Sequence, residues 1–312
     1  DMVRGIECDA ATKAIILNSV AFIRFAECEF DAALQVIDAI LALPDEVPAV
    51  EIAAAQALRG VIEICLGDSK EGRRDLREGI EQARMLGPLN YVMLSHYWGT
   101  VAMLGMCKAD NLVADTQEAL RCAESFGDVS GIIAARWAHG TVLLRAENAS
   151  HDEAIDLLER ARTMVLKHKL NVIGLTTVGA DLAIDAARQG RRDEGIDDLR
   201  ASFLLHIDSG SRVFVGRTGE ALIELLVERG SVGDLAEAHR IVDRWQARRP
   251  SIAATDLWWL KSRALLAGAE GNSDGYVELS KTYLEFCKKL DARGRLPEAR
   301  RMVEESLGLR QG

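Results

Sequence analysis

The chain has 312 residues, 48% of them hydrophobic and 28% charged, with a formal net charge of −10. Nucleic-acid binders usually carry a basic face, so this charge argues against a phosphate-binding surface. The most apolar run, residues 14–26, is too short to span a bilayer and contains Arg24, so we expect no membrane insertion either.

Small residues recur along the chain at intervals of 39 to 43 residues, each inside a segment whose apolar spacing predicts a helix. A glycine inside a helix costs about 1 kcal/mol relative to alanine, so its recurrence predicts a packing role in which a second helix approaches closely. These repeat-packing positions are Ser19, Gly60, Gly99, Gly140, Gly179, Gly219 and Ser262.

In chain order, each of these helices is followed by a polar or glycine-containing turn and then by a second amphipathic helix. Gly67, Gly127, Gly190 and Gly230 are typical helix stops. A last helix is expected from about Leu296 to Leu307, where it caps the array. The core-facing positions of the seven second helices align at Ala33, Leu76, Thr116, Ala154, Gly195, Ala238 and Tyr276.

The repeating unit is therefore a pair of antiparallel helices. No segment alternates with a period of two, so we expect essentially no strand. The sequence predicts an all-α fold, a right-handed α-solenoid of about seven helix-turn-helix repeats with a C-terminal capping helix. No long linker divides the chain, so residues 1–312 should form a single elongated domain. Because the first residue is Asp1 rather than methionine, we expect a fragment of a larger protein.

The chain carries no local signature of catalysis, such as a phosphate-binding loop, a zinc-protease motif or a nucleophile elbow. We therefore expect no catalytic residue, cofactor or metal. His139 and His151 fall on the two helices of one pair, where a shared metal site is the alternative to two separate surface or hydrogen-bonded histidines. The cysteines lack a CxxC pair and are expected to be reduced and mostly buried; they are Cys8, Cys28, Cys65, Cys107, Cys122 and Cys287.

A stack of helix pairs offers a concave wall, lined mainly by the first helix of each pair, along which a partner can lie. Positions one and five residues after each small residue are expected to face this wall. Their mixed polar character suits polar recognition, although ordinary exposed residues are an equal alternative. Trp137 and Trp259 are candidate aromatic anchors or core residues, and Trp258 is expected in the core. The candidate wall comprises Arg24, Thr100, Thr141, Arg145, Glu220, Glu224 and Arg263.

A small residue in the first helix and an alanine pattern in the second, as at Ala154 and Ala161, resemble a tetratricopeptide repeat. The period near 40 resembles the longer repeats of MalT-like regulators. Residues 221–244 and 256–291 are similar to the C-terminal region of actinobacterial multidomain signalling proteins, notably class III adenylyl cyclases fused to an AAA-type or STAND ATPase. This resemblance implies a cytoplasmic parent that makes cyclic AMP under the control of an NTPase switch. A kinase or a LuxR-type DNA-binding domain could equally precede such a tail.

Two functions follow as hypotheses. The first is a regulatory module of a cytoplasmic signalling protein that binds a protein or peptide partner, or its own upstream NTPase or effector domain. The alternative is a sensor of a small-molecule inducer, which predicts a deep pocket with converging polar groups. An enzymatic function is the least supported, because no motif indicates one.

Overall fold

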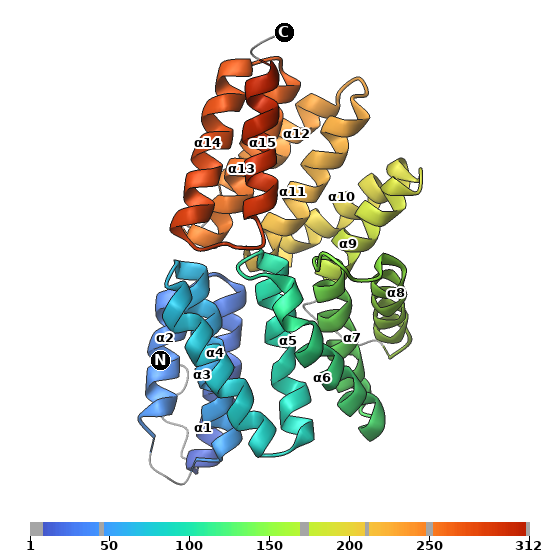
Figure 1. Ribbon diagram of the computed structural model, residues 1–312. Coiled ribbons are helices and arrows are strands. Elements are labelled where there is room, and N and C mark those ends of the chain that lie inside the picture. Colours follow the sequence, from blue (N-terminus) through green and yellow to red (C-terminus); the bar gives the residue numbers. More distant parts are fainter. Residues whose placement is uncertain (1–8, 44–46, 169–174, 210–211, 248–251, 310–312) are drawn as a thin grey trace.

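Helices joined by short turns make up nearly all of the described chain, as the computed structural model in Figure 1 shows. The structure describes residues 9–43, 47–168, 175–209, 212–247 and 252–309, and within them it contains no strand. The helices of these residues are α1 (Ala10–Ala26), α2 (Phe30–Leu41), α3 (Ala49–Leu66), α4 (Ser69–Met85), α5 (Pro88–Leu104), the 3₁₀ helix η1 (Ala109–Leu112), α6 (Val113–Phe126), α7 (Val129–Leu143), α8 (His151–His168), α9 (Leu175–Arg188), α10 (Arg192–Ser209), α11 (Arg212–Arg229), α12 (Asp234–Gln246), α13 (Ala253–Ala269), α14 (Ser273–Lys289) and α15 (Leu296–Leu309).

The predicted pairs of helices are present in the predicted order. Each odd-numbered helix from α1 to α13 contains one of the small residues, and each is followed by its partner. The capping helix predicted from about residue 296 is α15. Gly67 and Gly127 end α3 and α6 in the left-handed conformation, with φ of 103° and 71°, which glycine adopts without steric cost. The all-α repeat fold is therefore confirmed.

The pair formed by α3 and α4 shows why the sequence folds in this way. Leu76, Ile80 and Ala83 lie on one face of the otherwise polar helix α4, and all three are fully buried. A Cβ atom built on Gly60 of α3 would lie 2.5 Å from the carbonyl oxygen of Gly72 in α4. The two backbones thus meet where neither helix has a bulky side chain, and this proximity adds dispersion contacts.

Other small residues occupy comparable positions. A Cβ on Gly140 would lie 3.0 Å from the carbonyl oxygen of Ala154 in α8, and one on Gly179 would lie 3.4 Å from the hydroxyl of Ser202 in α10. A Cβ on Gly219 would meet aromatic rings of both α10 and α12. Ser262 is fully buried in α13. These sites differ in tightness, and only the closest of them exclude a methyl group.

Two of the seven positions differ from the expectation. Ser19 is exposed, and its hydroxyl donates a hydrogen bond to the carbonyl of Ile15 in the same helix. Gly99 of α5 faces α7 of the next repeat instead of α6, because a Cβ there would lie 2.8 Å from the Cα atom of Ala138. The period marks the repeat, but the direction in which each position faces depends on how neighbouring repeats are rotated.

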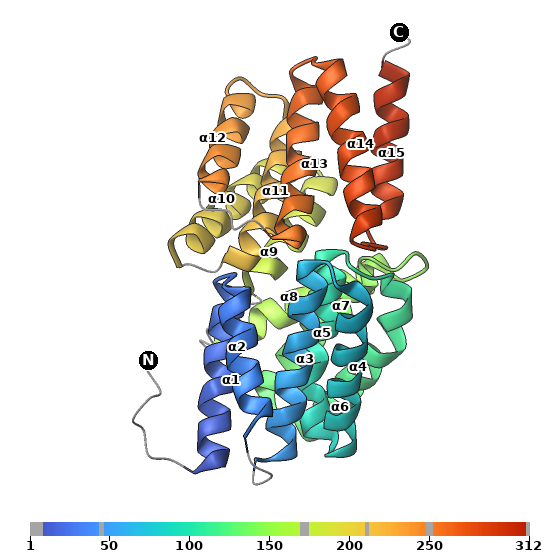
Figure 2. The same ribbon diagram turned by 90° about the vertical axis from the view of Figure 1, so that its left-hand side faces the viewer.

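The array folds back on itself into two layers, with α1–α8 in one and α9–α15 in the other (Figures 1 and 2). The first layer meets the second where α1 contacts α11 and α3 contacts α13. The α14–α15 loop also reaches the first layer: Ser69 Oγ donates to the carbonyl of Leu290 at 2.6 Å, and the amide of Gly294 donates to the carbonyl of Gly105 at 3.1 Å. Residues far apart in sequence therefore share one junction.

The cysteines in the described residues are free thiols, and Cys8 lies outside those residues. Burial raises the pKa of Cys28 and of Cys287 to about 12, so their thiols stay protonated and unreactive. Within the described residues, none of the helices combines the length with the hydropathy needed to cross a bilayer.

Glu63 of α3 gives the fold a pH dependence near neutrality. Burial, with the negative charge of Asp75 on α4, raises the pKa of Glu63 from 4.5 to about 7. The folded chain therefore holds a proton that the unfolded chain has already released, and the free energy of unfolding falls as pH rises between these two values. We expect Glu63→Gln to be more stable than the parent chain by about 1 kcal/mol at mildly alkaline pH, allowing for solvent screening.

The measurement is urea unfolding of both chains across this pH range. The advantage of Glu63→Gln should vanish below the ordinary carboxyl pKa, where Glu63 is protonated in both states. An advantage that does not change with pH would show that the carboxyl does not titrate as described.

Candidate functional site

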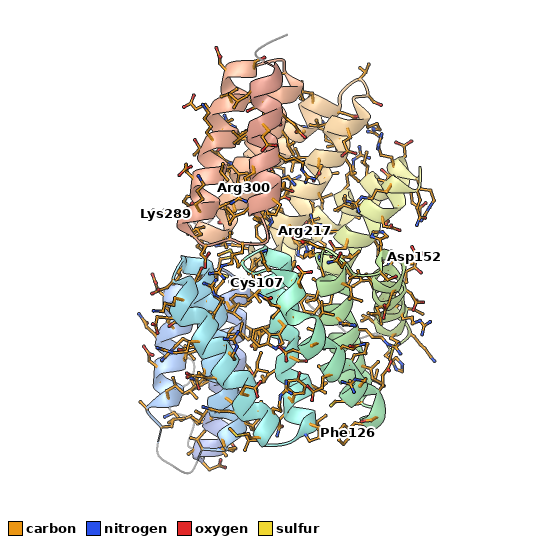
Figure 3. The ribbon with its side chains drawn as sticks, in the orientation of Figure 1. Cys107, Phe126, Asp152, Arg217, Lys289 and Arg300 are labelled. Carbon is orange, nitrogen blue, oxygen red and sulfur yellow. The ribbon has the colours of Figure 1, made fainter. Side chains whose placement is uncertain are left out.

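A cavity of about 280 Å³ lies at the junction of the two layers. In Figure 3, Cys107 of the first layer and Arg217 of the second both lie near this junction. The cavity walls come from α5, η1, α8, α9, α11, α13 and α15, together with the segments that follow α5, α7 and α14. Its acidic and basic lining residues are Arg145, His151, Asp181, Asp185, Arg188, Arg217, Glu220, Glu224, Lys261, Arg295 and Glu298.

The first charged group of the cavity is centred on Asp181 of α9, whose side chain is almost fully buried. Arg145, just after α7, lies 2.9 Å from Asp181 Oδ1, and Arg217 of α11 lies 2.8 Å from the same oxygen. Burial alone would raise the pKa of Asp181, but the two guanidinium groups outweigh burial and lower it. One ionised carboxylate thus joins three neighbouring repeats.

The second charged group is centred on Lys261 of α13. Its Nζ atom lies 3.0 Å from Glu220 and 3.2 Å from Glu224, both on α11, and 2.8 Å from Glu298 on α15. Arg295 adds a second cation, 3.2 Å from Glu220. Burial opposes the charge on Lys261, but the three carboxylates raise its pKa well above the ordinary value.

Arg295 connects this second group to the first layer. Its Nη1 atom donates to the hydroxyl of Tyr283 at 3.1 Å, and its Nε atom donates to the carbonyl of Leu104 at 3.1 Å. Burial alone would raise the pKa of Glu220, but the positive charges of Lys261 and Arg295 outweigh burial and lower this pKa to about 2. The ion network of α11, α13 and α15 is therefore tied to the end of α5.

The two histidines that could have shared a metal have separate partners. His151 Nε2 lies 2.7 Å from Asp185 at the cavity, whereas His139 Nδ1 lies 2.9 Å from the hydroxyl of Thr116 in the core. In the part of the chain that the structure describes, no group of three or more His, Cys, Asp or Glu side chains could hold a metal ion. The contacts between the charged side chains of the cavity are ion pairs and hydrogen bonds.

The seven candidate wall residues do not form one continuous surface. Arg145, Glu220 and Glu224 meet at the cavity. Thr100 and Thr141 are buried, with 4% and 0% of their surfaces exposed, so they cannot contact a partner. The expectation was wrong for these two threonines, because in α5 and α7 the position directly after the small residue is buried.

The remaining two wall residues lie elsewhere. Arg24 forms an ion pair with Glu29 at the end of α1. The guanidinium of Arg263 lies over the ring of Trp259, 5.3 Å from its centroid. Neither residue lines the cavity.

The candidate aromatic anchors also differ from each other. Trp137 is buried, with 7% of its surface exposed, and packs near Gly99. It is therefore a core residue, which is one of the two roles that the sequence suggested for it. Trp258 is fully buried, as expected, whereas Trp259 beside it is partly exposed. Of the two candidates, Trp259 is the one still accessible to a partner.

Sequence reasoning missed most of the charged lining, including Asp181, Arg217 and Lys261. These residues lie two after Gly179, two before Gly219 and one before Ser262, so no single offset from the small residue finds them. A search for opposite charges about one repeat apart could have found them. Asp181 is 36 residues from both of its arginines, and Lys261 is 37 residues from both Glu224 and Glu298.

Neither a protein-family model nor a curated protein sequence matches this chain. Solved structures do resemble it. The apo form of RapI matches with a TM-score of 0.51 and 13% identity, covering 94% of this chain and 99% of RapI. A Rap protein complexed with competence and sporulation factor matches with a TM-score of 0.50 and 11% identity, covering 93% of this chain and 88% of the other.

The apo form of the quorum sensor NprR from B. thuringiensis gives a TM-score of 0.46 and 12% identity, covering 98% of this chain and 90% of NprR. The matches to the two Rap proteins, at this low identity, establish a shared fold, the tetratricopeptide-like helical repeat. The narrower resemblance to MalT-like regulators and to adenylyl cyclase fusions stays a prediction.

Proposed function

We propose that this chain is a non-catalytic regulatory module whose junction cavity binds a peptide segment, either free or part of a partner protein. The observation that carries the proposal is the convergence of charged side chains from both layers on one cavity. Arg145 belongs to the first layer, whereas Asp181, Glu224 and Lys261 belong to the second. Buried charges are costly, and their concentration at an accessible cavity is typical of a binding site.

A peptide suits the chemistry of this cavity. Its backbone supplies donors and acceptors, and its charged groups can pair with lining residues of either sign. One solved structure with this fold is a Rap protein complexed with competence and sporulation factor, so the fold can hold a bound factor. The likeness supports a binding role, and the ionisable lining of this chain suggests what its ligand would contact.

Regulation would follow from the position of the cavity. The lining groups come from both layers, so a ligand that contacts both would favour the arrangement in which the layers meet as they do here. A signalling effector domain joined to the same chain, as the cyclase and STAND resemblance implies, could respond to that arrangement. The NTPase or effector domain is thus a proposed recipient of the signal.

The alternative is a small-molecule inducer in the same cavity. The volume of about 280 Å³ lies just below the range of about 300–1,000 Å³ that is usual for small-molecule pockets, so an inducer would have to be small. The convergent polar groups of the cavity fit the sensor hypothesis equally well.

Affinity capture from a lysate, followed by mass spectrometry, tests the binding module. Glu224→Lys reverses a charge that lines the cavity, whereas Glu228→Lys makes the same change one turn further along α11, at a residue that does not line it. We expect a partner that the parent chain and Glu228→Lys retain and that Glu224→Lys loses. A partner retained equally by all three chains would contradict the proposed site. A metabolite extract can then be added to the parent chain. If the extract prevents capture of the partner and also raises the melting temperature of the chain, the small-molecule inducer is favoured.

A further inference from the structure

The charged groups of the cavity fall into two clusters with opposite surpluses. The cationic cluster, on α9 and its neighbours, contains three arginines, Arg145, Arg188 and Arg217, and two carboxylates, Asp181 and Asp185. Counting these arginines and carboxylates, it has a surplus of one positive charge.

The anionic cluster, on α11, α13 and α15, has the reverse composition. It contains two cations, Lys261 and Arg295, and three carboxylates, Glu220, Glu224 and Glu298. Its surplus is one negative charge. The cavity as a whole is close to neutral but strongly polarised, which favours a ligand that is polarised in the opposite sense.

Each cluster also has one charged side chain that can still form a hydrogen bond or ion pair with a ligand. Arg188 lines the cavity and forms no ion pair with any of the described residues. Glu224 contacts Lys261 through Oε2, and 37% of its side chain stays exposed, so Oε1 can accept a further hydrogen bond. By contrast, Glu220 uses both of its oxygens, one for Lys261 and one for Arg295.

The distance between the clusters limits the length of the ligand. Arg217 and Glu224 are seven residues apart, two turns of α11, so they lie on the same face about 10 Å apart along the axis. An extended peptide rises about 3.3 Å per residue, so about three residues span this distance. The cavity volume of about 280 Å³ also requires a short ligand.

We propose that the cavity recognises both charged ends of a short free peptide of about three residues. The cationic cluster binds its terminal carboxylate, through Arg217 and Arg188, and the anionic cluster binds its terminal ammonium, through Glu224. This inference rests on the proposed function and makes it more specific, because an internal segment of a partner protein has neither terminal charge.

Other charged ligands fit less well. A phosphate or another simple anion would neutralise the cationic cluster but would leave the surplus on Glu224 and its neighbours unpaired. A polyamine would satisfy the anionic cluster alone. A zwitterion compensates both clusters at once, and its charge-assisted hydrogen bonds would be the strongest contacts in the cavity.

The probe is trialanine, whose methyl side chains leave the two termini as its only charges. Isothermal titration calorimetry would compare it with N-acetyl-trialanine and with trialanine amide. Because a hydrogen bond between charged groups contributes about 1.5–3 kcal/mol, we expect each modification to weaken binding about tenfold or more. Equal affinity for all three peptides would overturn the recognition of the termini.

Two variants assign each end of the peptide to its cluster. Glu224→Gln should weaken the binding of trialanine but have little further effect on the binding of N-acetyl-trialanine, which has already lost its ammonium. Likewise, Arg217→Gln should weaken the binding of trialanine but have little further effect on the binding of trialanine amide, which has already lost its carboxylate. Arg217→Gln leaves Asp181 paired with Arg145, so the fold should persist. Glu228→Gln, at a residue outside the cavity, is the matched control. Fully additive effects would overturn the assignment even if trialanine binds.

The outcomes separate this inference from the proposed function. If blocked peptides bind as tightly as trialanine and Glu224→Gln weakens all of them, the cavity binds peptides but does not read their ends. If none of the three peptides binds, the inference fails, and the capture experiment with Glu224→Lys decides the proposed function independently.

Discussion

Replacing Lys261 with methionine is expected to lower the free energy of unfolding by about 3–5 kcal/mol, which is the usual cost of removing one partner from a buried ion pair. Lys261 is 4% exposed and lies among the carboxylates of Glu220, Glu224 and Glu298. Without its ammonium group, these three carboxylates repel one another, and only Arg295 remains beside Glu220. Guanidinium unfolding followed by circular dichroism measures the loss.

Two further variants show whether the buried charge is the cause. Lys288→Met removes a lysine from an exposed pair with Glu285 and should change stability by less than about 1 kcal/mol. Adding Glu220→Gln to Lys261→Met removes the most buried of the carboxylates and should restore part of the loss. A loss that is unaffected by Glu220→Gln would indicate lost packing by the lysine stem instead of an uncompensated charge.

Replacing Gly60 with alanine is expected to destabilise the chain by about 3 kcal/mol, although alanine is the better helix former. The new Cβ would lie 2.5 Å from the carbonyl oxygen of Gly72 and 2.8 Å from the Cα atom of Leu76, both backbone atoms of α4. Backbone atoms cannot rotate away as a side chain can, so α3 and α4 would have to separate. Thermal and urea unfolding both report this change.

Gly268 of α13 is the matched control for this substitution. A Cβ there would lie 3.6 Å from the ring of Tyr276, an ordinary van der Waals distance. Gly268→Ala should therefore raise stability by about 0.5–1 kcal/mol through helix propensity alone. A glycine-to-alanine substitution is thus expected to lower the free energy of unfolding in α3 and to raise it in α13. Equal effects at both positions would contradict the close approach of α3 and α4.

Part of the candidate site could be predicted from the sequence. Arg145, Glu220 and Glu224 follow from the rule that residues shortly after each small residue lie on the inner face. The rule fails for Thr100 and Thr141, which are buried. A fixed offset assumes identical rotation of every helix, whereas the interval between small residues varies from 39 to 43 residues in this chain.

The sequence by itself determined the elements of this protein. Apolar spacing and glycine stops act within a few turns of one helix, so the seven pairs and the capping helix α15 can be read without knowing their neighbours. Only the tertiary structure decided that the array folds back, so that Gly294 pairs with Gly105 and Arg295 reaches Leu104. That closure depends on the small rotation of each repeat relative to the one before it, added up over many repeats. No local sequence pattern predicts this total rotation. The ion pairs of each charge cluster join neighbouring repeats, but the closure places the end of α5 and Arg295 at the same cavity.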